Sequence, residues 1–289
     1  MFALTTDFNG ESRKASEVKD TLARIARAGF SHIHWCHEWT GYYIYSIHEM
    51  HQIREWCDEL GLKVCGVHAS MGDKNCDLKH YTSSNEYNRL AGVELIKNRI
   101  DLTGILDAKE AVLHLPVVSQ LFDSDIEYRE QFIRCMLRSF DELEDYCKTL
   151  CVRICIENLN FSSLTGHHLF KILFDRYDCD YMGLCFDTGH ALMSCKNNFL
   201  EYAETYNDRL FMIHVHDNYG ETDDHLIPFD GNFDWDGFAP VLARSPCKYP
   251  LLIESSCKSY PNPVDEKSWL EKTYLAGCRF SEMADKFRV

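Results

Sequence analysis

The stretch that decides the fold is RICIENL, residues 153–159, because it is a short apolar run that ends in a carboxylate, Glu157. A buried strand with a polar group at its end has this pattern. The pattern recurs in VCGVHAS (64–70), AVLHLP (111–116), GLCFDTGH (183–190), LFMIHVHDN (210–218) and PLLIESS (250–256). With the loop after residue 220, these runs carry nine potential ligands of a divalent cation, which are His68, His114, Glu157, Asp187, His190, His214, Asp223, His225 and Glu254. Carboxylate oxygens and imidazole nitrogens bind such ions, so the pattern indicates a metalloenzyme.

Strand-like runs alternate with longer helical patterns along the whole chain. The runs cover residues 2–8, 30–38, 62–69, 110–116, 152–158, 182–187, 210–216 and 249–255. Ser46 and Gly61 delimit one expected helix, Ser124 is expected to open another, and Asp234 and Asp265 are expected N-caps. Strands that alternate with helices pair in parallel through crossover connections.

Eight strand-helix units in 289 residues predict an α/β fold, a single (β/α)₈ TIM barrel over residues 1–289. An open doubly wound sheet would normally carry a glycine-rich phosphate turn after its first strand, and LTTDFNG (4–10) has no such turn. All strands of a barrel open their carboxyl ends on one face. We therefore expect the nine residues to meet there.

The charge and composition fit an ordinary soluble enzyme. The formal charge of −15 and the absence of a basic cluster argue against a nucleic-acid partner. No apolar stretch is long enough to span a bilayer and the start MFALTTDFNG lacks a secretion pattern, so we expect no membrane contact and a cytoplasmic location. The 14 cysteines are expected to be mostly buried and reduced. A homo-oligomer is one of the states that the sequence allows.

Glu157 and Glu254 each follow an apolar strand, where an unpaired carboxylate would be costly. Metal binding, or an ion pair with Arg or Lys, would compensate that cost. Two glutamates across one barrel mouth also suit proton abstraction and return on two faces of a carbon, so both are candidate catalytic residues. Asp187 and His190, in FDTGH, are expected to point into the same cavity, and the alternative is a helix cap with an incidental imidazole.

The remaining candidates divide into ligands and substrate contacts. His68 and His114 follow strands, and the alternative for each is a buried histidine that binds no metal. Asp223 and His225 lie on a loop, and the alternative is that their side chains are only solvated. His214 and His216 alternate and therefore face the same side of their strand. The segment HIHWCHEWT (32–40) has the aromatic and polar character of a sugar platform, with core packing as the alternative. The expected substrate-binding residues are His34, His37, Trp39, Asn158 and His216.

The order of these motifs resembles the xylose isomerase-like TIM-barrel superfamily. The matching segments are ENLN from Glu157, FDTGH, IHVHDN, DDHLIPFDGNFDW and LLIES. The superfamily includes sugar and sugar-phosphate isomerases and epimerases, inosose-processing enzymes and endonuclease IV. The loop DDHLIPFDGNFDW is similar to a type written HLLPGEGxxDW, with Phe229 and Asp230 in place of the usual Gly-Glu.

The resemblance implies two alternative activities. In the ketose 3-epimerase branch, the residues at Glu157, Asp187, His214 and Glu254 hold one divalent ion, usually Mn, Co or Mg, and the two glutamates double as acid-base groups. In the endonuclease branch all nine positions carry three Zn ions, but the basic DNA-contact loops of that branch are not evident here. The leading hypothesis is a divalent-metal-dependent isomerase or epimerase of a small carbohydrate substrate: a sugar, sugar phosphate or cyclitol. The alternative is a multinuclear zinc phosphoesterase, and a sugar-binding barrel without catalysis is the third.

Overall fold

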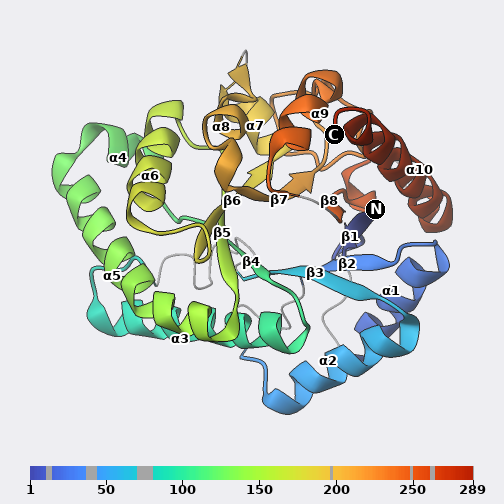
Figure 1. Ribbon diagram of the computed structural model, residues 1–289, viewed down its shortest axis with the longest axis horizontal. Coiled ribbons are helices and arrows are strands. Elements are labelled where there is room, and N and C mark those ends of the chain that lie inside the picture. Colours follow the sequence, from blue (N-terminus) through green and yellow to red (C-terminus); the bar gives the residue numbers. More distant parts are fainter. Residues whose placement is uncertain are drawn as a thin grey trace.

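The computed structural model describes residues 1–10, 15–36, 44–69, 81–195, 198–247, 250–260 and 264–288. Eight parallel strands close into one barrel in the chain order β1 to β8, and helices surround the barrel (Figure 1). The predicted (β/α)₈ barrel is thus confirmed. The strands are β1 (Phe2–Thr5), β2 (His32–Trp35), β3 (Lys63–His68), β4 (Glu110–Leu113), β5 (Arg153–Glu157), β6 (Met182–Asp187), β7 (Leu210–Val215) and β8 (Leu251–Ile253).

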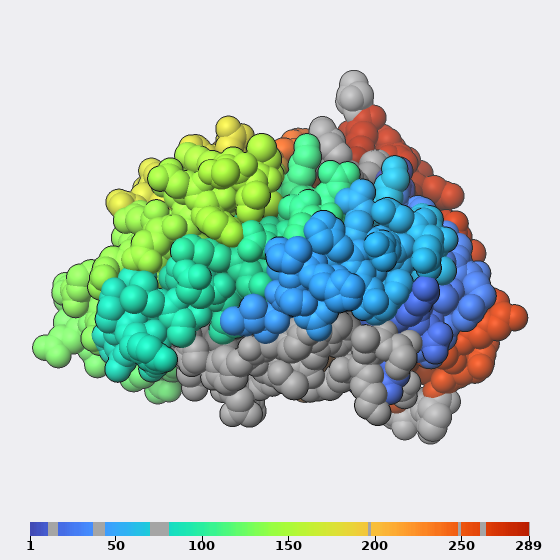
Figure 2. All heavy atoms as spheres, turned by 90° about the horizontal axis from the view of Figure 1, so that it is seen from below, coloured from blue at the N-terminus to red at the C-terminus, as the bar shows by residue number. Residues whose placement is uncertain are grey.

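The outer layer consists of helices of very different length. They are α1 (Ala15–Arg27), α2 (Ile47–Leu60), α3 (Glu86–Ile105), α4 (Ser119–Ser124), α5 (Ile126–Leu150), α6 (Ser163–Arg176), α7 (Thr188–Cys195), α8 (Glu201–Thr205), α9 (Trp235–Arg244) and α10 (Glu266–Asp285), with short 3₁₀ turns η3 (Asn207–Arg209) and η4 (Cys257–Ser259). Figure 2 shows part of this wall, where α1, α2, α3 and α5 lie side by side. No helix in the described ranges is long and apolar enough to cross a membrane.

Local sequence explains where several helices begin and end. Ser46 and Glu49 form a capping box at the start of α2, and Gly61 ends this helix with a positive φ of 67°. Asp234 and Asp265 cap α9 and α10 as predicted. The prediction for α5 was wrong by one residue, because its cap is Asp125. The Asp125 carboxylate accepts hydrogen bonds from two main-chain N–H groups, while Ser124 is the last residue of α4.

The interior of the barrel determines which side chains reach its mouth. Val112, Cys155, Cys185 and Met212, from four neighbouring strands, form a buried cluster of their own, separate from the cluster between these strands and the helices. Side chains along a strand alternate between its two faces, so the residue two positions further points to the same side. That residue is respectively His114, Glu157, Asp187 and His214. The candidate site therefore continues the barrel interior toward its carboxyl end.

Candidate metal centre and active site

A cavity of about 430 Å³ opens at the carboxyl ends of the strands. This volume is in the usual range for small-molecule sites. Seven of the nine expected ligands line the cavity, while Asp187 and His214 are fully buried beside them. The described lining residues are Asp7, Cys36, His68, His114, Glu157, Leu159, His190, Asp223, His225 and Glu254.

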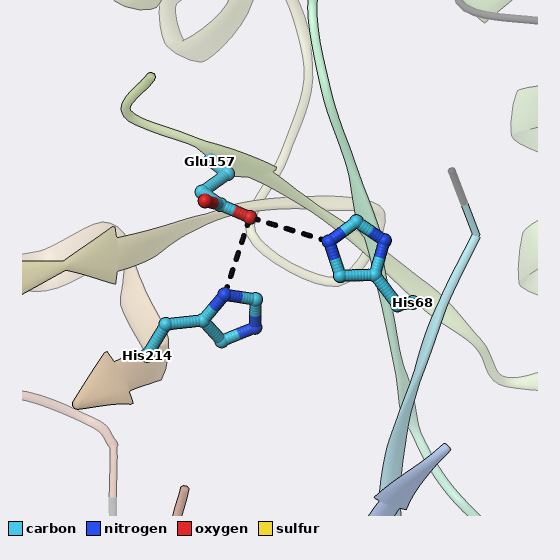
Figure 3. A group of neighbouring side chains, drawn as sticks. All are labelled: His68, Glu157 and His214. Carbon is cyan, nitrogen blue, oxygen red and sulfur yellow. Dashed lines mark ion pairs between the residues drawn. The ribbon is translucent and has the colours of Figure 1, made fainter. Parts of the chain in front are cut away.

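Glu157 is the centre of the group, because both of its carboxylate oxygens lie close to imidazoles from other parts of the barrel. Its Oε2 atom lies 3.1 Å from Nε2 of His114, 3.2 Å from Nδ1 of His214 and 3.6 Å from Nε2 of His68. Its Oε1 atom lies 3.0 Å from Nδ1 of His190. Figure 3 shows the Glu157 carboxylate between the rings of His68 and His214. One carboxylate thus joins residues that are far apart in the sequence.

A second group of side chains surrounds His214, which also lies close to the Glu157 carboxylate. Nδ1 of His214 lies 2.8 Å from Oε2 of Glu254 and 4.0 Å from Oδ2 of Asp187. Glu157, Asp187, His214 and Glu254 together satisfy the spacing of a single-ion site. The ligand types, three carboxylates and one imidazole, suit Mn, Co, Mg or Zn.

The loop after β7 contributes a third group. Oδ2 of Asp223 lies 3.3 Å from Nε2 of His190 and 3.3 Å from Nε2 of His225. Asp223 and His225 also have metal-like spacing with His216. All nine residues expected to be ligands are therefore near one another, in three groups at one end of the barrel.

Two observations test whether these residues fit a divalent cation. Both ring nitrogens of His214 are buried without a hydrogen-bond partner among the described residues, although carboxylate oxygens lie close to Nδ1. Buried polar atoms are rarely left in this state, and a bound cation would satisfy them. In addition, Nδ1 of His225 lies 2.7 Å from the main-chain carbonyl oxygen of Glu254 and must donate to it. In the neutral ring, Nε2 of His225 would then carry the lone pair that binds a cation, and a cation would replace the proton at this position. The residues present fit the ion.

The electrostatics of the site keep its carboxylates ionised. Burial raises the pKa of Glu157, but His114 and His214 outweigh burial and hold this pKa well below its usual value. For Glu254, His214 likewise overcomes burial and lowers the pKa. In His225, burial lowers the pKa, but the hydrogen bond to Asp223 and the charge of that carboxylate, together with the charges of Glu254 and Asp187, outweigh burial and raise the pKa to about 10. The carboxylates thus need nearby positive charge, which protons or a cation can supply.

Asn158 and His216, expected to bind substrate, instead hold Asp187 in place. Asn158 is fully buried, its Nδ2 donates to the Asp187 carbonyl at 2.9 Å, and its Oδ1 accepts from the Asp187 N–H at 2.8 Å. Nε2 of His216, also fully buried, lies 3.0 Å from Oδ2 of Asp187. Oδ1 of Asp187 accepts from the N–H of His190 at 2.6 Å, so Asp187 also caps α7. Neither Asn158 nor His216 lines the cavity.

His34 lies below the cavity and is fully buried. A Cβ atom on Gly66 would lie 3.1 Å from Nδ1 of His34, so the absence of a side chain at Gly66 makes room for this ring. His34 is not among the described residues that line the cavity, and its role in substrate binding stays a prediction. His37 and Trp39, the other members of the expected sugar platform, lie outside the described residues.

Three further residues shape this site and were not predicted from the sequence. Asp7 and Cys36 line the cavity at the ends of β1 and β2, and Asp7 could have been found because it falls at the end of the first apolar run. Asp217 is fully buried and accepts from the N–H groups of Phe229 and Phe233 and from Nε1 of Trp235. It organises the loop that carries Asp223 and His225, and no local signal separates it from an ordinary loop aspartate.

The loop after β7 keeps a glycine-like backbone at the position where the sequence departs from the expected pattern. Phe229 has a φ of 77°, a conformation that a side chain disfavours by roughly 1–2 kcal/mol. Its ring lies under the guanidinium of Arg279, 3.7 Å from the ring centroid, and contacts Trp235. Asp230 accepts from the Tyr260 hydroxyl at 2.8 Å and pairs with Lys272. These contacts of Phe229 and Asp230 hold the loop in place.

Comparison with known proteins agrees with this architecture. Residues 22–277 match the family described as xylose isomerase-like TIM barrel, and the chain belongs to this family. An uncharacterized protein of Sinorhizobium fredii, y4fM, is 33% identical, with 94% of this chain and 91% of that protein covered.

Two solved structures are similar in fold at lower identity. A D-tagatose 3-epimerase-like protein has a TM-score of 0.76 at 21% identity, with 99% of this chain and 98% of the other covered. A D-psicose 3-epimerase, solved in the presence of D-fructose, has a TM-score of 0.73 at 16% identity, with coverages of 98% and 99%.

Proposed function

We propose that this protein is a divalent-metal-dependent isomerase or epimerase of a small sugar, sugar phosphate or cyclitol. The observation that carries the proposal is the placement of Glu157 and Glu254. They come from β5 and β8, line the same cavity, and lie 3.2 Å and 2.8 Å from the same nitrogen of His214. The names of the similar solved structures, both 3-epimerases or like them, support the same class of reaction.

The two glutamates are the groups that move the proton. One removes a proton from the carbon next to the substrate carbonyl, which gives an ene-diolate, and the other glutamate or the same one returns it. The cation, held by Glu157, Asp187, His214 and Glu254, would supply Lewis-acid polarisation of the substrate oxygens. Because the pKa of each glutamate is lowered, both are ionised at neutral pH but are weak bases, so the reaction depends on the cation to acidify the substrate.

Substitution of the glutamates tests the proposal. Glu157→Gln and Glu254→Gln keep the shape of the side chain and remove its basicity, so we expect at least a 100-fold loss of turnover with an unchanged circular dichroism spectrum. Incorporation of solvent deuterium into free ketoses, ketose phosphates and cyclitols, followed by NMR, measures proton abstraction directly. The exposed Glu55→Gln on α2 is the matched control. Wild-type exchange rates in either site variant would remove its catalytic role.

A second candidate, a multinuclear zinc phosphoesterase, is favoured by one specific observation. Three groups with metal-like spacing adjoin, and Glu157 belongs to two of them. Neighbouring metal ions can generate and orient a hydroxide for attack on phosphorus. The loop residues Asp223 and His225, which the single-ion site does not need, are accounted for by this alternative.

Metal content separates the two candidates. About one Mn, Co or Mg per chain, in protein purified without chelator, supports the isomerase or epimerase, and about three Zn per chain supports the phosphoesterase. Hydrolysis of bis(4-nitrophenyl) phosphate by the same preparation is the parallel activity test. Hydrolysis without deuterium exchange on any carbohydrate would replace the leading proposal with the second.

A further inference from the structure

A fourth acidic side chain, Asp7, faces the cavity without belonging to the metal-like groups of the described residues. Asp7 follows β1 and lines the cavity beside Cys36, which follows β2. The two strand ends are tied together, because the N–H of Cys36 donates to Oγ1 of Thr6 at 2.9 Å and the N–H of Thr6 donates to the carbonyl of His34 at 3.0 Å. Asp7 is thus held on a fixed part of the barrel rim.

Hydrogen bonds fix one oxygen of this carboxylate and leave the other to the cavity. Oγ1 of Thr5 lies 2.6 Å from Oδ1 of Asp7 and 3.0 Å from Sγ of Cys36. A hydroxyl has one hydrogen and a carboxylate only accepts, so Thr5 donates to Asp7 and accepts from the Cys36 thiol. Burial and the nearby Asp7 charge raise the pKa of Cys36 well above its usual value, which keeps the thiol protonated as a donor. Within the described ranges, Oδ2 of Asp7 has no protein donor.

The charge of the residues around the cavity limits which chemical groups can lie beside Oδ2 of Asp7. Among the described residues that line the cavity, none is Lys or Arg, and four are carboxylates: Asp7, Glu157, Asp223 and Glu254. Glu157, Asp223 and Glu254 each belong to a group with metal-like spacing, but Asp7 is outside every such group found in the described ranges. Burial, together with Glu254, raises the pKa of Asp7, so its carboxylate is poorly solvated and gains from a donor. A phosphate beside it would be repelled.

We propose that Asp7 accepts a hydrogen bond from a hydroxyl group of the substrate and selects unphosphorylated polyhydroxy carbonyl compounds over their phosphates. This inference rests on the isomerase or epimerase activity proposed above and narrows its substrate class. Asp7 acts as a specificity-determining residue, and the Cys36–Thr5–Asp7 chain orients its carboxylate. The hydroxyl proton of the substrate fills the position that the protein leaves open at Oδ2.

The test compares free and phosphorylated ketoses on the full chain loaded with Mn²⁺. Binding of D-fructose, D-tagatose, D-psicose and their monophosphates is measured by calorimetry, and kcat and KM by deuterium exchange. In the wild type we expect the free sugars to bind at least tenfold more tightly than the phosphates. Asp7→Asn and Asp7→Ala should raise Kd and KM for the free sugars by about 10- to 100-fold, with a smaller effect on kcat. Asp7→Asn should also reduce the ratio between the Kd for the sugar phosphates and the Kd for the free sugars.

The possible outcomes distinguish a failure of the role proposed for Asp7 from a failure of the proposed activity. Binding of free sugars that weakens in Asp7→Asn, without turnover of any sugar, supports Asp7 and overturns the proposed activity. Turnover that Asp7→Asn leaves unchanged, or a wild-type preference for phosphates, overturns the role of Asp7 alone. Absence of both binding and turnover overturns both. The exposed Asp20→Asn on α1 controls for charge, and thermal unfolding verifies that each variant folds.

Discussion

His225 donates a hydrogen bond from Nδ1 to the main-chain carbonyl of Glu254 at 2.7 Å. The bond ties the loop after β7 to the end of β8 and leaves Nε2 as the ring nitrogen that faces Asp223. The imidazole also stacks on His216, with ring centroids 4.0 Å apart and planes 10° from parallel. The backbone of His225 has a φ of 47°, a strained conformation that these contacts maintain. Nε2 is therefore presented to the Asp223 side of the cavity before any ligand binds.

Removal of this imidazole should weaken cation binding at the loop. We expect His225→Ala to reduce Zn²⁺ affinity by at least about tenfold. If the loop group binds an ion of its own, the Zn²⁺ stoichiometry should also fall by one per chain. Calorimetric titration of chelator-treated protein measures both quantities. His48→Ala, an exposed histidine on α2, is the control. An unchanged titration curve in His225→Ala would show that the loop histidine is not a ligand.

Gly189 in the FDTGH motif is required by the ring of His216. A Cβ atom at this position would lie 2.0 Å from Cε1 of His216, which is fully buried. We expect Gly189→Ala to displace the ring, destabilise the fold by about 1–3 kcal/mol and weaken metal binding through Asp187. Gly104→Ala on α3 meets nothing within 4 Å and should be neutral or slightly stabilising. Urea unfolding of both variants provides the comparison, and equal stabilities would contradict the steric role.

The sequence predicted the barrel and the meeting of the nine candidate ligands for one physical reason. A carboxylate or imidazole at the end of a strand, or directly after it, lies at the barrel mouth, as Glu157 and Glu254 show. The roles of Asn158 and His34 could not be predicted in this way. Whether a polar side chain faces the cavity or the neighbouring strand depends on packing partners distant in sequence, such as Gly66 beside His34 and Asp187 beside Asn158.

His34 makes the stability of the protein sensitive to acid. Burial, followed by the neighbouring His214 and His68, lowers the pKa of His34 well below 6.5. A group with a lowered folded pKa binds its proton more readily in the unfolded chain. Its contribution to stability is therefore present above pH 6.5 and is lost as the pH falls toward the folded pKa. We expect metal-loaded His34→Gln to lose less stability than the wild type between pH 7 and pH 5. Parallel melting temperatures over this range test it, and equal slopes would contradict it.

Asp217 is expected to determine whether the loop after β7 is ordered at all. Its Oδ1 accepts from the N–H groups of Asn218 and Phe233, and its Oδ2 accepts from the N–H of Phe229 and from Nε1 of Trp235. A Cβ atom on Gly231 would lie 2.3 Å from Oδ1, so the loop closes tightly around the carboxylate.

Asp217→Asn should therefore disrupt the loop, because the amide turns an N–H group toward donors that need an acceptor. Since hydrogen bonds to a charged group contribute about 1.5–3 kcal/mol each, we expect a loss of about 3 kcal/mol in the free energy of unfolding. Cation binding that involves Asp223 and His225 should weaken, while the affinity of the Glu157, Asp187, His214 and Glu254 group changes less. Asp224 lies on the same loop, and among the described residues its side chain accepts a hydrogen bond only from the Thr222 hydroxyl, so Asp224→Asn should shift stability by less than about 0.5 kcal/mol. Urea unfolding and metal titration of the pair measure the difference. Equal effects in the two variants would mean that the loop is held by its apolar contacts and not by Asp217.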